Sequence, residues 1–160
     1  MLKFFNNPSR QRRVLAVASG GGHWVQLLRL MPAFDDCDIA FVTVSDAYRS
    51  QIAGETRRFY VVPDATRWNK LKLGWMALRL VIILLIERPD VIVSTGAAPG
   101  FFALRVGRWF GARTVWIDSI ANVEQLSMSG EKIGRHADLW LTQWPHLARP
   151  QGPHFAGAVL

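Results

Sequence analysis

The sequence contains only one cysteine, Cys37, among its 160 residues. A single thiol excludes an internal disulfide and cannot by itself form a metal cluster. Half of the residues are hydrophobic, yet no stretch reaches the roughly 18 to 20 uncharged apolar residues that a membrane-spanning helix needs. A cleaved signal peptide is not indicated either, because the first arginines follow the apolar residues instead of preceding them. We therefore expect a cytosolic protein that is soluble or lies on a membrane.

Acidic residues are scarce: 12 of them face 19 lysines and arginines, which gives a net charge of +7. Such a surplus predicts an anionic partner, which could be nucleic acid, acidic lipid headgroups or a phosphorylated substrate. No nucleic-acid-binding motif accompanies the charge, so we do not expect nucleic acid as a partner. Internal repeats and low-complexity segments are also lacking. The length suits one domain with a real core and is too short for two ordinary domains.

Residues 1–13 (MLKFFNNPSRQRR) mix phenylalanines with lysine and arginines. This mixture suits contact with an anionic membrane surface, where aromatic rings enter the interface and cations meet acidic lipid. A disordered leader with incidental phenylalanines fits the pattern equally well. We predict a basic and aromatic leader over residues 1–13 and a single domain over residues 14–160.

Three consecutive glycines follow the first predicted strand, which spans residues 14–18. A helix comes next and is expected to end at Pro32. Without β-carbons the turn can bend sharply and admit a polar group to the helix N-terminus, so it predicts a phosphate or diphosphate site. A turn that serves only tight strand–helix packing is the alternative. The dinucleotide pattern G-x-G-x-x-G is absent, so we expect neither an NAD site nor another cofactor. The residues predicted for this site are Ser19, Gly20, Gly21 and Gly22.

The remaining pattern alternates strands with helices. Asn69 is a plausible N-cap for a long helix that ends at Pro89, and apolar residues surround this helix on all sides. Such a helix is either buried in a core or in contact with lipid. Alternation of this kind predicts an α/β fold with a doubly wound parallel sheet. Further strands are expected at residues 38–44, 59–62, 90–94, 113–117 and 139–141, with further helices beginning near Pro99 and spanning 131–136.

Loops that follow parallel strands meet at one edge of the sheet, so residues 19–23, 95–100 and 118–124 are expected to share a site. His23 lies at a helix N-terminus, where the dipole favours a neutral imidazole that can accept a proton. Two glycine-rich loops, one histidine and two carboxylates suit binding of a diphosphate and deprotonation of a hydroxyl. The candidates are His23, Asp118 and Glu124 for catalysis, and Thr95, Gly96, Gly100 and Asn122 for binding, with no metal.

Each candidate side chain also has a simpler interpretation. His23 could cap or pack against its helix, Asp118 could cap a loop, and Glu124 could be a solvated loop residue. These alternatives stay open at the level of the sequence.

Four motifs together resemble a known family: SGGGH, DVIVSTGAAPG, WIDSIANVEQLSMSGEKIGRHADLWLTQWPHL and the terminal GAVL. They are similar to the membrane-recruiting subunit of the eukaryotic dolichyl-diphosphate-linked N-acetylglucosaminyltransferase and to its bacterial exopolysaccharide counterparts of the PssD type. The resemblance covers nearly the whole chain from Arg13 onward. It implies the Rossmann-like, N-terminal, acceptor-binding half of a GT-B glycosyltransferase, similar to that half of MurG.

The resemblance also implies a function. We expect a subunit of an inverting hexosyltransferase that transfers a sugar from a UDP-sugar to a polyprenyl-diphosphate-linked acceptor in exopolysaccharide biosynthesis. Glucuronate, galactose, glucose and N-acetylglucosamine all fit this expectation. The implied partners are a small subunit resembling a GT-B C-terminal half, which carries the nucleotide-sugar site, the lipid-linked saccharide and an anionic membrane surface. A non-catalytic membrane scaffold that recruits and activates the partner subunit is the alternative.

Matched positions carry expected roles. His23 belongs to the motif that faces the acceptor, Gly96 and Gly100 to a loop near the lipid diphosphate, and Asp118 to the acidic position after the fifth strand. Eukaryotic members of the family have an N-terminal transmembrane helix, whereas only MLKFF precedes the arginines here. We therefore expect peripheral or monotopic attachment to the cytoplasmic face of the inner membrane, with the helix at 69–88 as a further contact.

Overall fold

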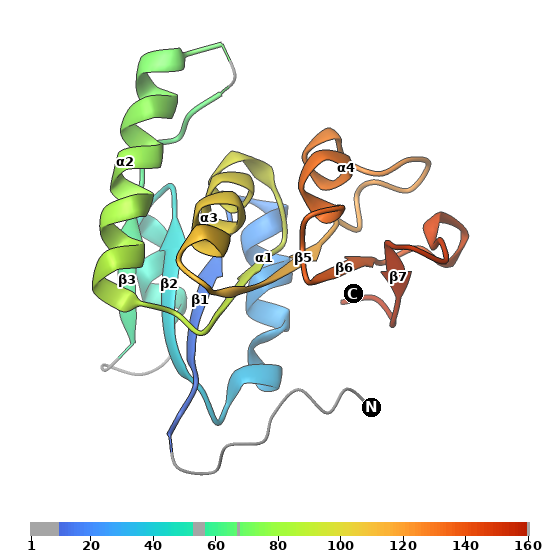
Figure 1. The fold of residues 1–160 in the computed structure, drawn as a ribbon, viewed down its shortest axis with the longest axis horizontal. Helices are drawn as coiled ribbons and strands as arrows, with labels where there is room; N and C mark the ends of the chain where they lie inside the picture. The colour runs from blue at the N-terminus through green and yellow to red at the C-terminus, as the bar shows by residue number, and fades with distance from the viewer. Residues whose placement is uncertain (1–9, 53–56, 67, 160) are drawn as a thin grey trace.

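The computed structural model describes residues 10–52, 57–66 and 68–159, so most of the predicted leader lies outside the described residues. In the described part of the chain, parallel strands form one seven-stranded sheet in the order β3-β2-β1-β4-β5-β6-β7 (Figure 1). The strands are β1 (Arg13–Val17), β2 (Asp38–Thr43), β3 (Arg58–Val61), β4 (Val91–Ser94), β5 (Arg113–Ile117), β6 (Leu139–Thr142) and β7 (His154–Phe155).

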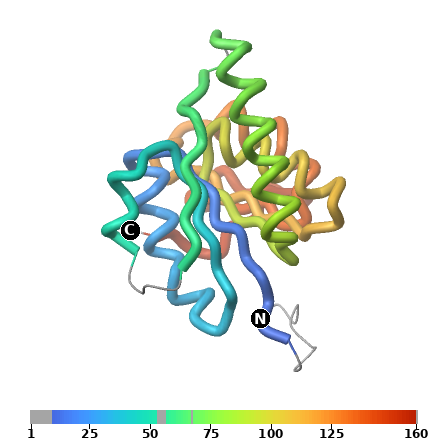
Figure 2. The backbone as a smooth tube through the Cα atoms, turned by 90° about the vertical axis from the view of Figure 1, so that its left-hand side faces the viewer, coloured from blue at the N-terminus to red at the C-terminus, as the bar shows by residue number. Residues whose placement is uncertain are grey.

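Helices cover both faces of this sheet. One face carries α1 (Gly22–Arg29), and the other carries α2 (Lys70–Glu87), α3 (Ala97–Trp109) and α4 (Met128–Gly134). Figure 2 shows the two layers on either side of the strands. Side chains of β1 alternate between two cores: Leu15 and Val17 pack on the α2 and α3 side, and Val14 and Ala16 on the α1 side. The predicted doubly wound parallel sheet is confirmed.

Element boundaries differ from the prediction in a few places. Pro32 does not stop α1 directly; it lies in the 3₁₀ helix η1 (Met31–Phe34), where a proline is tolerated in the first turn. Helix α4 begins three residues earlier than predicted, because the Ser127 hydroxyl caps it by accepting the Gly130 N–H at 2.8 Å. Two further 3₁₀ helices, η2 (Asp46–Gln51) and η3 (Pro145–Leu147), and the short edge strand β7 carry no clear periodicity in the sequence.

Helix α2 has one buried face and one exposed apolar face. The Asn69 side chain accepts the Lys72 N–H at 3.0 Å, which confirms the predicted N-cap. Met76, Leu80 and Leu84 are fully buried under the helix, so its prediction as a core helix holds for this face. No helix in the described residues is long and apolar enough to cross a membrane. The opposite face, which we call the apolar face of α2, consists of Leu71, Trp75, Leu78, Ile82, Leu85 and Ile86.

A partly buried ionic network anchors the end of α2 to the sheet. Glu87 is only 6% exposed and receives the Arg58 Nε donor at 2.9 Å from each carboxylate oxygen, while the Tyr60 hydroxyl also donates to it. Arg58 in turn binds Asp38 at 2.9 Å. Burial, together with Glu87, raises the pKa of Tyr60 to about 12, so the phenol remains a proton donor. This network fixes α2 against β2 and β3.

Candidate functional site

The predicted site lies where the winding of the sheet reverses. Neighbouring strands β1 and β4 pair with Val17 opposite Ser94, so the loops that follow them emerge side by side. Their helices leave in opposite directions, because α1 covers one face of the sheet and α3 the other (Figure 1). Ligands of open α/β sheets bind at such a switch point, outside the carboxyl ends of the strands.

The first glycine turn, residues 19–23, leads directly into α1. Gly21 has φ 62° and ψ −135°, a conformation that side-chain-bearing residues avoid, and no side chain caps the helix that it begins. A β-carbon on Gly21 would meet nothing within 4 Å, so backbone conformation, not crowding, requires glycine here. The Ser19 carbonyl accepts a hydrogen bond from the Thr43 hydroxyl at 3.3 Å.

His23 and Thr95 join this turn to the second glycine turn, residues 95–97. The His23 Nδ1 lies 2.8 Å from the Thr95 carbonyl oxygen, and the Thr95 hydroxyl donates to the His23 carbonyl at 2.7 Å. A carbonyl only accepts, so Nδ1 carries a proton, and the tautomer that follows for a neutral ring has its lone pair on Nε2. Thr95 is itself fully buried, which makes it a support for His23.

Gly96 makes room for the imidazole. Its φ is 137°, and a β-carbon there would lie 2.5 Å from the His23 Cε1 atom. Helix α3 also begins at Gly96 without a side-chain cap. Two helix N-termini with open backbone donors therefore meet beside one histidine.

Tyr48 is a member of the site that the sequence analysis missed. Its hydroxyl oxygen accepts the Gly21 N–H at 2.8 Å, and its ring lies on the buried Trp24 with 5.2 Å between centroids. The Gly21 amide is thus already occupied. The amides of Gly22 and His23, the first two of α1, are the ones left for an anion. A tyrosine in a polar segment gives no local signal of this contact, which spans 27 residues.

Asp118 is a buried carboxylate that fixes the loop at residues 119–127. It is 2% exposed, and its carboxylate accepts from the Ser119 N–H at 2.9 Å, Asn122 Nδ2 at 2.6 Å, and the Ser127 N–H and hydroxyl at 3.2 and 3.1 Å. Four donors occupy the carboxylate, as in its interpretation as a capping residue. Asn122 therefore points into the protein, and Glu124 lies exposed on the same loop, residues 119–127.

Gln26 and Gln143 connect that loop to the first glycine turn. Gln26 donates to the Gly22 carbonyl and the Ser119 hydroxyl, both at 3.1 Å, and accepts from the Ile120 N–H and from Gln143 Nε2. Both glutamines are at most 5% exposed. Every hydrogen-bonding position of the Gln26 amide is used. The only signal for the role of Gln26 in the sequence is its place as a polar residue on the buried side of an apolar helix.

Gly100 has a different place from the other predicted glycines. It is buried inside α3, where a β-carbon would lie 1.8 Å from the Ser94 hydroxyl oxygen. The glycine allows α3 to approach β4 closely and does not face the switch point. Its predicted contact with a diphosphate stays a prediction.

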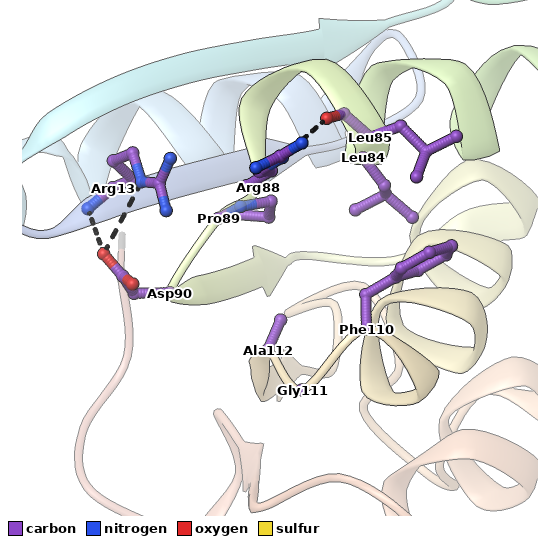
Figure 3. A pocket seen from close by; sticks show the side chains of 9 residues that line it. All are labelled: Arg13, Leu84, Leu85, Arg88, Pro89, Asp90, Phe110, Gly111 and Ala112. Carbon is purple, nitrogen blue, oxygen red and sulfur yellow. Dashed lines mark hydrogen bonds and ion pairs between the residues drawn. The ribbon is translucent and has the colours of Figure 1, made fainter.

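Two pockets in the described part of the chain have no lining from His23. One of about 470 Å³ is at the opposite, amino-terminal edge of the sheet, between the ends of α2 and α3 (Figure 3). Arg13, Arg88 and Asp90 line it, and Asp90 accepts the Arg13 backbone N–H at 2.9 Å and lies 3.9 Å from the Arg13 Nε. No candidate residue lines this pocket. Among the described residues, no group of three or more histidine, cysteine or acidic side chains could hold a metal ion.

Comparison with known sequences identifies similar proteins. A profile of the family described as "Oligosaccharide biosynthesis protein Alg14 like" matches residues 66–159. The UDP-N-acetylglucosamine transferase subunit ALG14 of Yarrowia lipolytica is 27% identical over 154 residues, covering 92% of this chain and 67% of the relative. The protein of that name in Schizosaccharomyces pombe is 25% identical over 164 residues, covering 86% of this chain and 78% of the relative.

Comparison with solved structures shows the fold. MurG of Acinetobacter baumannii superposes with a TM-score of 0.73 at 12% identity, over 92% of this chain and 45% of MurG. UDP-N-acetylglucosamine 2-epimerase of Rickettsia bellii gives 0.69 at 14% identity, over 94% of this chain and 46% of the epimerase. The chain thus spans less than half the length of these proteins. The predicted Rossmann-like fold of the GT-B type is confirmed.

We predict that Gly96→Ala displaces the His23 ring. A methyl group at Gly96 would overlap Cε1, so the ring must leave Thr95 or the turn must shift. The ¹H–¹³C NMR signals of the His23 ring should move, while those of His136 and His154 stay in place. Gly111→Ala is the matched control, because Gly111 also has a positive φ, 81°, but open space around it. Unmoved His23 signals in Gly96→Ala would contradict the contact.

Proposed function

We propose, because the chain belongs to the family of Alg14-like oligosaccharide biosynthesis proteins, that it is the acceptor-binding subunit of a two-component glycosyltransferase. The reaction moves a sugar from a UDP-sugar to a polyprenyl-diphosphate-linked acceptor in exopolysaccharide assembly. One observation carries the proposal: His23 and Thr95 join two uncapped helix N-termini at the switch point of the sheet.

The diphosphate of the acceptor binds between the two glycine turns. The N-termini of α1 and α3 supply backbone donors and the positive ends of two helix dipoles, and both favour an anion. The Gly22 and His23 amides contribute from one turn, and the Ala97 amide, the first of α3, contributes from the other, because the Gly96 N–H already donates to the Ser94 hydroxyl at 3.1 Å. Gly20 allows the first turn to lie close to Tyr48: a β-carbon on Gly20 would be 2.8 Å from the Tyr48 hydroxyl oxygen.

His23 is the general base of this proposal. Its Nε2 lone pair takes the proton of the acceptor hydroxyl as the hydroxyl oxygen attacks the anomeric carbon of the sugar. The bond between that carbon and the diphosphate of UDP breaks, UDP leaves, and the anomeric configuration is inverted. Asp118 and Gln26 act as positioning residues, since they fix the loop and the turn and are themselves buried.

A second subunit supplies the nucleotide-sugar site. The relatives from both yeasts are named as transferase subunits, which supports a divided enzyme. The edge strand β7 exposes Phe155, which is 43% accessible, on a sheet edge that a second protein can cover. Positioning donor and acceptor across a cleft supplies a large part of a transfer rate, so either subunit alone should be nearly inactive.

The apolar face of α2 contacts the membrane. Leu71 is 89% exposed, and Trp75, Leu78, Ile82 and Leu85 continue the same face at intervals of three and four residues. Its exposed cations are Lys70, Lys72, Arg79 and Arg88, whereas the one acidic residue of the helix, Glu87, is buried. Apolar side chains among cations suit an anionic surface, which we assign to the cytoplasmic face of the inner membrane.

A membrane scaffold without catalytic residues is the second candidate. It is favoured by Asp118, whose carboxylate is fully occupied, and by the exposure of Glu124. In that case the partner subunit performs all of the chemistry.

We predict that His23→Gln lowers kcat of the reconstituted two-subunit complex by about a hundredfold to ten-thousandfold, the usual contribution of a general base. His136→Gln is the control, because its side chain is exposed in the turn that follows α4, and its hydrogen bonds are made by the backbone N–H and carbonyl. Activity is measured with UDP-sugars and a lipid-diphosphate acceptor, after co-purification confirms that the subunits associate. Unchanged kcat in His23→Gln would favour the scaffold.

We predict that Ile82→Glu weakens binding to vesicles of anionic phospholipid by about tenfold or more, because one buried side chain contributes about 1.5 to 3 kcal/mol. Val25→Glu is a matched control: both side chains are 46% exposed, but Val25 lies on α1, on the other face of the sheet. Vesicle co-sedimentation measures both. Equal loss in the two variants would indicate a general charge effect and contradict the assigned face.

A further inference from the structure

Tyr48 covers one side of the first glycine turn, next to Gly20 and Gly21. It belongs to η2, which Ser45 begins by accepting the Ala47 N–H at 3.3 Å. Its ring lies on Trp24, and the Trp24 Nε1 donates to the Gln51 side chain at 2.9 Å. Two contacts with one fully buried tryptophan therefore hold η2 against α1. The position of the Tyr48 hydroxyl is set by the core of the protein and does not depend on a ligand.

The Tyr48 hydroxyl has an unused donor at the turn. Its oxygen accepts the Gly21 N–H at 2.8 Å, which leaves the O–H bond free to point elsewhere. No residue in the described part of the chain accepts this proton. The hydroxyl binds Gly21, the residue that directly precedes the open amides of Gly22 and His23. A phenol that is already polarised by a donated N–H is also a stronger donor itself.

We propose that Tyr48 is a ligand-binding residue whose hydroxyl donates a hydrogen bond to a phosphate oxygen of the acceptor diphosphate. This inference rests on the proposed function, because it adds a side-chain contact to the same anion site. The Gly22 and His23 amides donate to the anion along the axis of α1, and the Tyr48 hydroxyl donates to it from the side of the turn. Tyr48 lies at the phosphate site and not at the reacting hydroxyl, so it contributes to acceptor affinity and leaves the chemical step to His23.

Tyr48→Phe tests this assignment with little disturbance of the fold. Phenylalanine keeps the ring on Trp24 and removes only the hydroxyl oxygen. Tyr60→Phe is the matched control, because Tyr60 is the second of the two tyrosines in the chain and its hydroxyl binds the buried Glu87. Both variants lose one phenolic oxygen, yet only Tyr48 lies at the glycine turn.

The first measurement is titration of the full chain with inorganic pyrophosphate, followed by ¹H–¹⁵N NMR of the Gly22 and His23 amides. Wild type and Tyr60→Phe should bind alike, and Tyr48→Phe should bind about tenfold more weakly, as expected for a hydrogen bond to a charged group. Equal affinity of Tyr48→Phe and wild type would overturn the role of Tyr48 and leave the anion site intact. Absence of binding in wild type would overturn the proposed anion site as well.

Kinetics of the reconstituted complex separate ligand binding from mere support of the turn. Loss of a phosphate contact should raise the acceptor KM about tenfold, with kcat and the KM for the UDP-sugar unchanged. A turn that has collapsed would displace His23 and lower kcat instead. A fall in kcat with an unchanged acceptor KM would therefore overturn the assignment.

Discussion

Two hydrogen bonds between His23 and Thr95 hold the candidate site together. They connect turns that are 72 residues apart in the chain, and they do so at the point where α1 and α3 diverge to opposite faces of the sheet. The contact depends on Gly96, since any side chain there would occupy the space of the imidazole. It depends equally on the register of β1 with β4, which brings the two turns to the same level. The proposed general base and the proposed anion site both depend on this one arrangement.

The fold was accessible from the sequence because its signals are local. Short apolar strands, the Asn69 cap and Pro89 set the boundaries of most elements, and alternation of strands with helices determined the parallel sheet. The residues that support the site could not be predicted from the sequence. Gln26 meets Gln143 across 117 residues and Tyr48 meets Gly21 across 27, so no spacing or periodicity encodes either contact. Residues 1–9 of the predicted leader lie outside the described residues, and its membrane contact stays a prediction.

Membership in a motif did not by itself distinguish residues that face a ligand from residues that support the site. Gly96 and Gly100 belong to the same glycine-rich segment, yet one admits the His23 ring and the other packs α3 against Ser94. Asp118 is acidic and lies at the correct edge, but four protein donors surround its carboxylate. Short polar motifs report where a site lies. Burial and hydrogen-bond partners are needed to assign the role of each residue.

The tautomer of His23 is the most direct test of this arrangement. Long-range ¹H–¹⁵N NMR correlations on the ¹⁵N-labelled full chain, at a pH where the imidazole is neutral, identify which ring nitrogen carries the proton. We predict the proton on Nδ1, donated to the Thr95 carbonyl, and a lone pair on Nε2 that can accept the proton of an acceptor hydroxyl. A proton on Nε2 would contradict both the junction of the two turns and the proposed general base.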